Sequence, residues 1–332
     1  MMKSTKLTNL FIGLFVAFLV LFLSELLLGR MNVAKQLGIT NMNEMFDSGV
    51  FVRDRLLFWR FSPGKFYAKP SPHYKGVLRI NSIGFREREI IKEKGPQTYR
   101  IFCLGGSNTC GEGLFENERF SNIIEQKLNS QPGVFNFEVY NFGMPGYSTL
   151  QMLRLFKNEL INFNPDLIIV NPEQADGLEL SGLAPLRDSQ IMILPPVIYH
   201  LTCFLEDHSA VYRLAKQNLL KDSWRVRNKR SENSAKSLAR VTLEEHKDNL
   251  SKMLKLAEDN GVKIIFLTAL GIRNNNVVNV DKDYGCQPSI DITPLFKNGQ
   301  NTGLFQDQGH INAKGHSLVA ELLAEYIKDN FF

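Results

Sequence analysis

Two short motifs at opposite ends of the chain carry the side-chain types that acyl transfer needs. Leu104 is followed by Gly105-Gly106-Ser107, where two glycines allow a tight turn that presents a hydroxyl at the end of a strand. Asp307 precedes His310 by three residues, so its carboxylate can hold one imidazole nitrogen while the other accepts a proton. Each motif alone also has a plainer interpretation, an N-cap serine and a surface turn. Only a fold that joins them would give a nucleophile, a base and an orienting carboxylate.

The elements that would position these motifs alternate from Tyr99 onward. Short β-branched or aromatic runs predict four strands, at Arg100–Leu104, Phe137–Asn141, Leu167–Asn171 and Lys263–Thr268. Apolar side chains at helical spacing predict helices through Phe120–Leu128, Leu150–Phe156 and Leu318–Ile327, with Ser148 as the N-cap of the second. This pattern predicts an α/β fold, a three-layer, doubly wound (flavodoxin-like) parallel sheet with a site at the carboxyl ends of its strands.

Composition excludes several classes of protein. The 332 residues carry a net charge of +5, and 44% of them are hydrophobic. These values are ordinary for a globular protein and exclude a disordered or collagen-like chain. The small, dispersed positive charge predicts no nucleic-acid partner. Four cysteines without a CxxC pair predict neither a disulfide scaffold nor a structural zinc site.

An almost wholly apolar stretch, Leu7–Leu28, lies near the N-terminus. As a helix, its about 22 residues would span roughly 33 Å, enough to cross the hydrocarbon core of a bilayer. Lys3 and Lys6 precede the stretch, so the positive-inside rule predicts a cytoplasmic N-terminus and an exported remainder. We expect one N-terminal transmembrane helix that acts as an uncleaved signal anchor, and a cleaved signal peptide is the alternative.

Three regions are predicted along the chain: a membrane anchor at 1–30, a lead-in segment at 31–98 that packs on the main domain, and the main α/β domain at 99–332. The lead-in contains an aromatic patch, Phe58–Phe61. A basic helical insertion at about 204–242 interrupts the main domain. This insertion is either a solvated helical segment or a basic arm that contacts anionic lipid headgroups or an acidic polymer.

The motifs, taken together, resemble those of an SGNH (GDSL-type) hydrolase over roughly residues 54–332. Gly105-Gly106-Ser107-Asn108-Thr109 is similar to the first block of that family, in a GGS rather than a GDS form. Val139–Ser148 resembles the second block, with the pattern NxGxxGxS, and Asp307–His316 resembles the last. Asn81–Arg86 resembles a lead-in of membrane-anchored bacterial relatives.

The resemblance implies a role for each matching residue. Ser107 corresponds to the nucleophile, His310 to the base and Asp307 to the carboxylate that orients the base. The backbone N–H groups of Ser107 and Gly146 correspond to oxyanion donors. No cofactor and no metal are implied. His316 is expected to support the last helix.

The third block departs from the family pattern Gly-x-Asn-Asp. Glu173 stands in place of the glycine and Ala175 in place of the oxyanion asparagine, whereas Asp176 keeps its position. Loss of one oxyanion donor typically costs about 10²–10³-fold in rate. Because Gln174 or Asn171 could supply an amide instead, three alternatives stay open. They are a compensated active enzyme, a slow or transferase-like enzyme, and a non-catalytic descendant.

The expected function is that of a membrane-anchored serine esterase or acyl hydrolase. Its expected substrates are ester groups, such as O-acetyl groups, of envelope polysaccharide or lipid. Its expected place is the bacterial inner membrane, single-pass, with the catalytic domain on the periplasmic side. The alternative is a catalytically weak or inactive SGNH-fold subunit that binds or modifies envelope polysaccharide or transfers O-acetyl groups. The expected partners are an acylated glycan or lipid and the membrane.

Overall fold

The computed structural model of the protein divides into two compact units. The described residues are 12–13, 15–25, 27, 49–67, 75–130, 133–172, 176, 187–215, 239–268, 270–273, 276–279, 288–296, 303–307 and 309–332. The larger unit comprises Leu56–Glu179, Arg187–Gln190 and Leu238–Phe332, and the smaller unit comprises Met1–Arg55, Leu180–Leu186 and Ile191–Ser237. The sheet and all of the predicted catalytic side chains belong to the larger unit.

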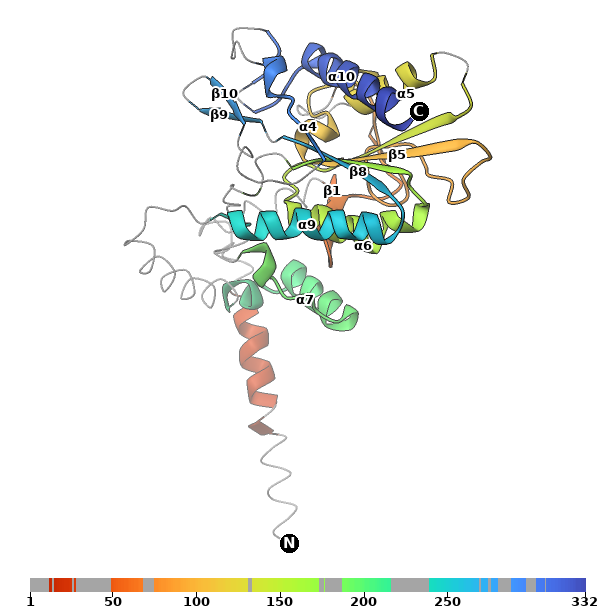
Figure 1. The fold of residues 1–332 in the computed structure, drawn as a ribbon. Coiled ribbons are helices and arrows are strands. Elements are labelled where there is room, and N and C mark those ends of the chain that lie inside the picture. Colours follow the sequence, from red (N-terminus) through yellow and green to blue (C-terminus); the bar gives the residue numbers. More distant parts are fainter. Residues whose placement is uncertain are drawn as a thin grey trace. The chain divides into compact units, whose positions relative to one another are not determined.

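A five-stranded parallel sheet forms the centre of the larger unit (Figure 1). Its strands are β5 Thr98–Gly105, β6 Asn136–Gly143, β7 Leu167–Asn171, β8 Lys263–Leu267 and β11 Ser289–Ile290. Their order across the sheet is β11-β8-β7-β5-β6, which is the order of flavodoxin-like folds. The predicted α/β fold with a parallel sheet is therefore confirmed. The order reverses at β5, so the topological switch point lies at the strand that leads to Ser107.

The ends of three strands meet beside the glycine turn. Gly105, the last residue of β5, pairs with Gly143 of β6 and with Asn171 of β7. All of β7 and the last six residues of β5 are buried, as expected for strands that are covered on both faces. The predicted first and second blocks, and the end of the strand that leads to the third, are thereby brought to one edge of the sheet.

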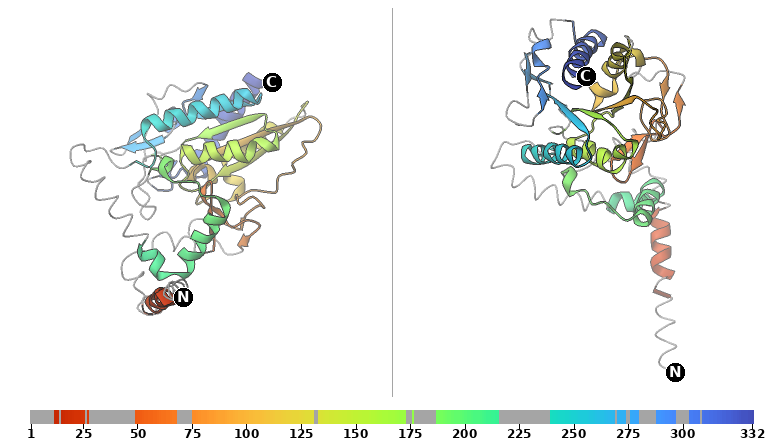
Figure 2. Two further views of the ribbon diagram at one scale, coloured as in Figure 1. Left: turned by 90° about the horizontal axis from the view of Figure 1, so that it is seen from below. Right: turned by 45° about the vertical axis from the view of Figure 1, so that its right-hand side comes forward.

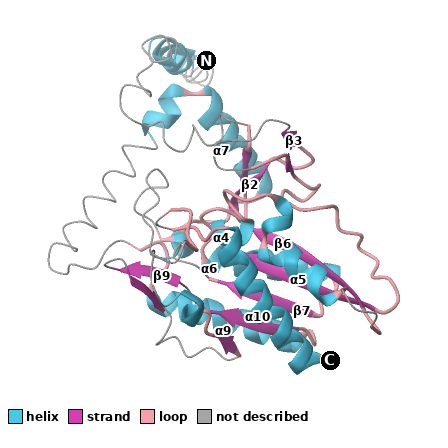
Figure 3. Ribbon diagram, turned by 90° about the horizontal axis from the view of Figure 1, so that it is seen from above, coloured by secondary structure: helices cyan, strands magenta, loops and turns pink. Residues whose placement is uncertain are grey.

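Helices cover both faces of the sheet and give three layers (Figures 1 and 3). On one face α5 Phe120–Leu128 packs with α10 Ala313–Phe331, and on the other α6 Thr149–Asn158 packs with α9 Leu243–Asp259. Figure 2 shows α6 and α9 side by side. Ser148 caps α6 as predicted, because its side chain accepts a hydrogen bond from the Gln151 N–H. None of the predicted helices corresponds to α9, which begins at a capping box formed by Thr242 and Glu245.

A hydrophobic core fills the space between the sheet and the pair α5–α10. Ile101 and Ile169 contribute from the strands, Phe120 from α5, and Val319 and Leu323 from α10, each at most 2% exposed. Burial of each such side chain contributes about 1.5–3 kcal/mol to stability. The predicted apolar stripe of the last helix thus faces the core, which fixes the loop that precedes α10.

Shorter elements complete the described structure. They are β1 Phe51–Asp54, β2 Phe58–Phe61, β3 Phe66–Tyr67, β4 Leu78–Arg79, α4 Ser107–Cys110, η1 Glu116–Glu118, η2 Leu160–Phe163, η4 Asp188–Gln190, α7 Pro196–His208, β9 Leu270–Arg273, β10 Asn276–Asn279 and η5 Thr293–Phe296. In the larger unit β3 pairs with β4, and β9 pairs with β10, both antiparallel. The lead-in therefore contains strands where the sequence shows no clear periodicity.

The smaller unit holds the apolar N-terminal stretch and α7. Residues 15–25 are helical, and residues 7–11, 14, 26 and 28 of the predicted span lie outside the described residues. Among the residues that the structure describes, no helix combines the length and the apolar character needed to cross a membrane. The carboxylate of Glu25 accepts hydrogen bonds from Ser209 Oγ at 2.8 Å and from Val211 N at 3.2 Å. Most of the predicted basic insertion, at 216–238, also lies outside the described residues.

Candidate active site

Ser107 lies at the start of α4, two residues after the carboxyl end of β5. Glycine is required at Gly105, because a Cβ there would lie 2.0 Å from Oγ1 of Thr109. Gly143 is equally crowded, since a Cβ there would lie 2.0 Å from the backbone nitrogen of Cys110. The close approach of these strand ends to α4 therefore determines where the Ser107 hydroxyl lies.

Ser107, His310 and Asp307 form a hydrogen-bonded chain, which we call the proton relay. His310 Nε2 lies 2.9 Å from Ser107 Oγ, across a separation of 203 residues. His310 Nδ1 lies 2.8 Å from Oδ2 and 3.0 Å from Oδ1 of Asp307. With the Nδ1 proton donated to Asp307, Nε2 is the acceptor for the serine proton. The structure thus brings together the three side chains that the motifs single out.

The carboxylate of Asp307 is held in its ionised form. Burial raises its pKa, but hydrogen bonds from the backbone N–H groups of Gly309 and His310 and from the imidazole outweigh burial, so the pKa lies below its usual value. The two backbone bonds measure 2.7 and 2.8 Å. An ionised Asp307 can only accept hydrogen bonds, so it fixes the proton of His310 on Nδ1.

Asn108 joins the nucleophile helix to the histidine loop. Its Nδ2 donates to Gly309 O at 2.9 Å, and its Oδ1 accepts from Ile311 N at 2.9 Å. These two contacts lie on either side of His310, so the residue next to Ser107 anchors the backbone that carries the base. This role of Asn108 was not predicted, because no local pattern reveals a partner 201 residues away.

Glu112 places a second carboxylate close to the imidazole. Its Oε2 lies 3.6 Å from His310 Nε2, and its backbone N–H donates to Ser107 O at 3.1 Å. A negative charge at this position favours the imidazolium that forms when Nε2 takes the serine proton. This residue was also missed, since a glutamate five positions after a serine has no diagnostic pattern.

Gly146, the predicted oxyanion glycine, lies in the turn that follows β6. Its φ of 74° is in the left-handed region, which favours glycine. The turn contacts the nucleophile turn through a hydrogen bond from Met144 N to Gly105 O at 3.0 Å. Asn141 of β6 also contacts α4, donating from Nδ2 to Thr109 O at 2.6 Å. The second block is therefore attached directly to the segment that carries Ser107.

The altered third block is described only at its two ends. Asn171 ends β7, and its Nδ2 donates to Oγ1 of Thr109 in α4 at 3.2 Å. The substituted positions Glu173 and Ala175, together with Gln174, lie outside the described residues.

Asp176, at the far end of the block, links α6 to α9. It accepts hydrogen bonds from Thr149 N at 2.8 Å and from Thr149 Oγ1 at 2.6 Å, and it lies 2.7 Å from Nδ1 of His246. All three side chains are buried. Its contacts therefore position helices and do not reach the proton relay.

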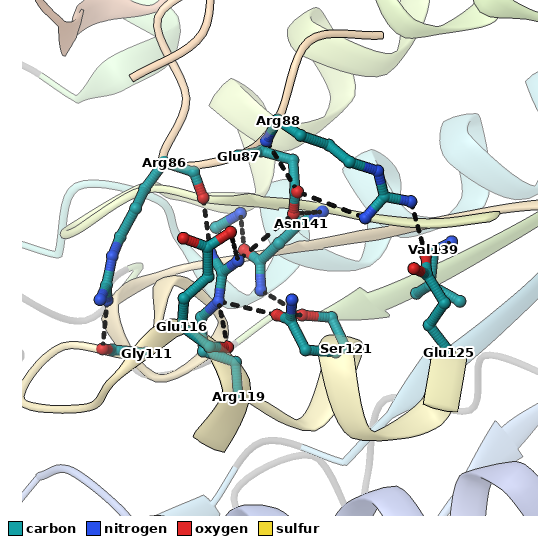
Figure 4. Close-up of polar contacts among 12 residues, drawn as sticks. Arg86, Glu87, Arg88, Gly111, Glu116, Arg119, Ser121, Glu125, Val139 and Asn141 are labelled. Carbon is teal, nitrogen blue, oxygen red and sulfur yellow. Dashed lines mark hydrogen bonds and ion pairs between the residues drawn. The ribbon is translucent and has the colours of Figure 1, made fainter. Parts of the chain in front are cut away.

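A buried cluster of Arg86, Glu87 and Arg119, which we call the brace, holds the end of α4 (Figure 4). Arg86 donates from Nη1 to Gly111 O at 2.8 Å and from Nη2 to Leu114 O at 2.7 Å. These carbonyls follow α4 directly in the chain. Arg86 therefore fixes the path of the backbone that leaves the nucleophile helix.

Within the brace, Glu87 links the nucleophile segment to β6. Its Oε2 accepts from Asn141 N at 2.9 Å and lies 3.5 Å from Nη2 of Arg119 (Figure 4). Burial raises the pKa of Glu87 and prevails over Arg119 and Arg88, whose charges lower it. Arg119 in turn donates from Nη1 to Arg86 O at 2.5 Å.

His316 is part of the core and takes no part in the proton relay. Its Nδ1 accepts a hydrogen bond from Phe120 N at 3.1 Å, and the two rings stack with centroids 5.7 Å apart. Burial, with a further contribution from the charge of Arg119, lowers the pKa of His316 to about 3. A neutral ring that supports α5 and α10 agrees with the structural role predicted for it. Across the described part of the chain, no group of three His, Cys, Asp or Glu side chains could hold a metal ion.

Several solved structures resemble this chain at low similarity. A G-D-S-L family lipolytic protein from Desulfitobacterium hafniense is 14% identical, with a TM-score of 0.42, and the match covers 68% of this chain and 98% of that one. A lipase/acylhydrolase from Enterococcus faecalis is 14% identical, with a TM-score of 0.42, covering 70% and 96%. An acetyl xylan esterase is 11% identical, with a TM-score of 0.43, covering 69% and 99%. These values are too low to indicate a substrate.

No curated protein sequence matches the chain. A sequence model of the GDSL-like lipase/acylhydrolase family matches residues 101–323, which is more than half of the chain. The matched residues contain Ser107, Gly146, Asp307 and His310. The resemblance seen in the motifs is confirmed at the level of the family: the protein belongs to the GDSL-like lipase/acylhydrolase family.

Proposed function

We propose that this protein is a serine esterase in which Ser107 attacks the carbonyl carbon of an ester. The observation that carries the proposal is the proton relay, with 2.9 Å between Ser107 and His310 and 2.8 Å between His310 and Asp307. Membership of an acylhydrolase family supports ester hydrolysis as the reaction type. The relay supports a role for each of the three side chains.

In the first half of the proposed reaction, His310 Nε2 takes the Ser107 proton while Oγ bonds to the carbonyl carbon. The electron pair moves to the carbonyl oxygen, to which the backbone N–H groups of Ser107 and Gly146 donate hydrogen bonds. The intermediate collapses when the imidazolium gives its proton to the departing alcohol oxygen, which leaves Ser107 acylated. In the second half, water attacks the acyl carbon with His310 as base, and the acid and the free serine are released. Asp307 stabilises the imidazolium in both halves.

The altered third block favours a second candidate function, that of a catalytically weak or inactive subunit. Without the oxyanion asparagine, the protein would be slow or transferase-like, or a binding subunit for envelope polysaccharide. The amide of Asn171, one of the two candidate substitute donors, donates to Oγ1 of Thr109 in the nucleophile helix at 3.2 Å. Covalent labelling of Ser107 by a fluorophosphonate would exclude the binding-only alternative.

We further propose that the protein is a single-pass protein of the bacterial inner membrane, with its catalytic unit on the periplasmic side. The apolar stretch Leu7–Leu28 and the preceding lysines support this placement. The exposed side chains of Phe15 and Phe18 in the helix at 15–25, at 64% and 65%, support the same placement. Protease added to spheroplasts should digest the catalytic unit, and its protection would contradict the placement.

The proposed location indicates a substrate class. A catalytic unit tethered to the outer face of the inner membrane meets O-acetyl groups of envelope polysaccharide and the ester groups of lipids. We therefore propose an acylated glycan or lipid as the substrate, an assignment that rests on the reaction type and the location.

Hydrolysis of p-nitrophenyl acetate by the full-length protein in detergent tests the proposed reaction. Ser107→Ala should lower kcat by at least about 10⁴-fold, because the nucleophile is lost. Ser130→Ala, which removes an exposed hydroxyl bonded to Lys127 O, is the matched control and should leave the rate unchanged. Equal turnover by wild type and Ser107→Ala would contradict the proposal.

A further inference from the structure

Both peptide groups that flank Gly146 are held by buried side-chain donors. On the N-terminal side, Nε1 of Trp59 donates to Pro145 O at 3.1 Å. On the C-terminal side, Nη1 of Arg240 donates to Gly146 O at 2.5 Å. Trp59 is 3% exposed and Arg240 is 4% exposed, so water has little access to either donor. The turn that carries the Gly146 N–H is thus fixed from both directions.

Trp59 is itself fixed by three neighbours. The hydroxyl of Tyr147 donates to Trp59 O at 2.6 Å, and the two rings meet edge to face with centroids 5.8 Å apart. The guanidinium of Arg240 lies over the indole, 5.3 Å from its centroid. The indole also packs against Gly146, where a Cβ would lie 3.4 Å from Trp59 Cζ2. These contacts leave the indole N–H one orientation, toward Pro145 O.

Arg240 is held in turn by acceptors that neutralise its charge. Its Nε and Nη2 donate to the two oxygens of Asp188, at 3.0 and 2.8 Å, and Nη2 also donates to Oε1 of Gln151 at 2.7 Å. Asp188 accepts a further bond from Ser148 Oγ at 2.6 Å. A buried ion pair with its hydrogen bonds satisfied is a rigid anchor. Arg240, which holds the Gly146 carbonyl, is therefore fixed as firmly as Trp59, which holds the Pro145 carbonyl.

The position of the Pro145 carbonyl determines the direction of the Gly146 N–H. These two groups belong to one planar trans peptide, in which C=O and N–H point in opposite directions. A donor fixed on the oxygen therefore fixes the direction of the N–H, and it also makes that N–H a stronger donor, because linked hydrogen bonds polarise one another. An oxyanion donor is most effective when it is already aimed before charge develops.

We propose that Trp59 is a positioning residue for ester hydrolysis, which aims the Gly146 N–H at the developing oxyanion by holding the Pro145 carbonyl. This inference rests on the proposed function, in which Gly146 is an oxyanion donor. Trp59 belongs to β2, outside the residues 101–323 that match the family. The lead-in segment thus contributes to the site through one residue of the aromatic patch, Trp59.

The test removes the indole N–H while keeping the shape of the ring. Trp59 is replaced by 3-benzothienylalanine in the full-length protein, with Trp59→Phe as a second variant. We expect kcat for p-nitrophenyl acetate to fall about 10-fold with KM within about two-fold of wild type, a smaller loss than the ~10²–10³-fold for removal of an oxyanion donor. Phe61→Leu, a buried residue of the same strand, is the control for stability and should keep its kcat.

A second measurement observes the proposed contact without turnover. In protein labelled with ¹⁵N-glycine, we expect the amide proton of Gly146 to move upfield in the benzothienylalanine variant, because the N–H loses polarisation. The same resonance should not move in Phe61→Leu. If Trp59 only supported the fold, the Gly146 resonance would not respond differently to the benzothienylalanine variant and to Phe61→Leu.

Two results would overturn the inference about Trp59. One is an analogue with unchanged kcat and an unchanged Gly146 resonance. The other is a loss of kcat that Phe61→Leu shares at an equal fall in Tm, which would show that β2 only supports the fold. Failure of the proposed function looks different, because wild type and Ser107→Ala would then hydrolyse the ester equally, and the role of Trp59 would fall with it.

Discussion

The proton relay and the brace both place ionisable side chains against the nucleophile helix, but the relay is partly exposed and the brace is buried. In the relay the side chains reach solvent, with His310 26% and Asp307 55% exposed. In the brace they are sealed, with Glu87 1% and Arg119 0% exposed. The relay contacts the hydroxyl that begins α4, whereas the brace contacts the carbonyls and the strand that follow it.

The two clusters also move carboxyl pKa values in opposite directions. For Asp307, burial raises the pKa less than its hydrogen-bond donors lower it, whereas for Glu87 burial prevails over the neighbouring arginines. A relay needs a carboxylate that stays charged while its neighbour gains and loses a proton. The brace needs only side chains that keep the same positions and hydrogen bonds. A carboxyl group thus serves proton transfer where it is partly exposed, and positioning where it is buried.

Of the substitutions that compare the relay with the brace, Asp307→Asn should cause the largest loss of rate. An amide of the same shape neither stabilises the imidazolium nor fixes its tautomer, so kcat should fall about 10²–10⁴-fold. The free energy of unfolding should change little, because the side chain is exposed. Ester hydrolysis and urea unfolding measured on one preparation check both statements, with the exposed Asp248→Asn as control. A rate within about three-fold of wild type would remove Asp307 from the relay.

Glu87→Gln should have the converse effect, on stability. It removes the buried counter-charge of Arg119, so the free energy of unfolding should fall by about 3 kcal/mol. The matched control is Glu116→Gln, because Glu116 lies 3.6 Å from the same Arg119 nitrogen but is 36% exposed, and its loss should cost below ~1 kcal/mol. Equal losses in urea unfolding would contradict the distinction between buried and exposed partners.

A third expected effect concerns the pH dependence of stability, to which the buried His316 contributes. The folded protein keeps His316 neutral down to a pKa of about 3, whereas the unfolded chain binds a proton near the ordinary value of 6.5. The unfolded state therefore binds more protons between these values, and stability falls as pH decreases through this window. His316→Asn should remove up to about 1.4 kcal/mol per pH unit of that slope.

Urea unfolding at a series of pH values between these limits measures the slope. Asn is chosen because its carbonyl can still accept the bond from the Phe120 N–H. His200→Asn, at an exposed position, is the control. A slope in His316→Asn equal to that of wild type would show that His316 is not the group that titrates on unfolding.

The parts of the fold that local sequence patterns determine could be predicted. Continuous apolar runs identified four of the five strands of the sheet, and the Ser148 cap and the stripe of α10 followed from helix periodicity. The two-residue strand β11 and the helix α9 were missed. β11 has only two residues, too few to show the alternation of apolar and polar side chains that is typical of a strand. The start of α9 adjoins the basic stretch, and its apolar side chains were therefore not separated from that stretch.

The residues of the candidate site also fall into those that local sequence patterns predict and those that they do not. The glycine turn and the Asp307–His310 spacing could be predicted from short stretches of sequence, because a tight turn and a carboxylate near an imidazole are short-range features. The contacts of Asn108, Glu112 and Trp59 depend on which segments the fold brings together, and their residue types fit many other settings. No local pattern could therefore assign them.

The most direct test of the central claim asks whether His310 activates the Ser107 hydroxyl. Full-length wild type and His310→Ala are incubated with a fluorophosphonate, and the adduct is located by mass spectrometry of the peptides. The relay predicts one adduct, on Ser107, in wild type and none in His310→Ala. An unlabelled wild type, or a label on another residue, would contradict it.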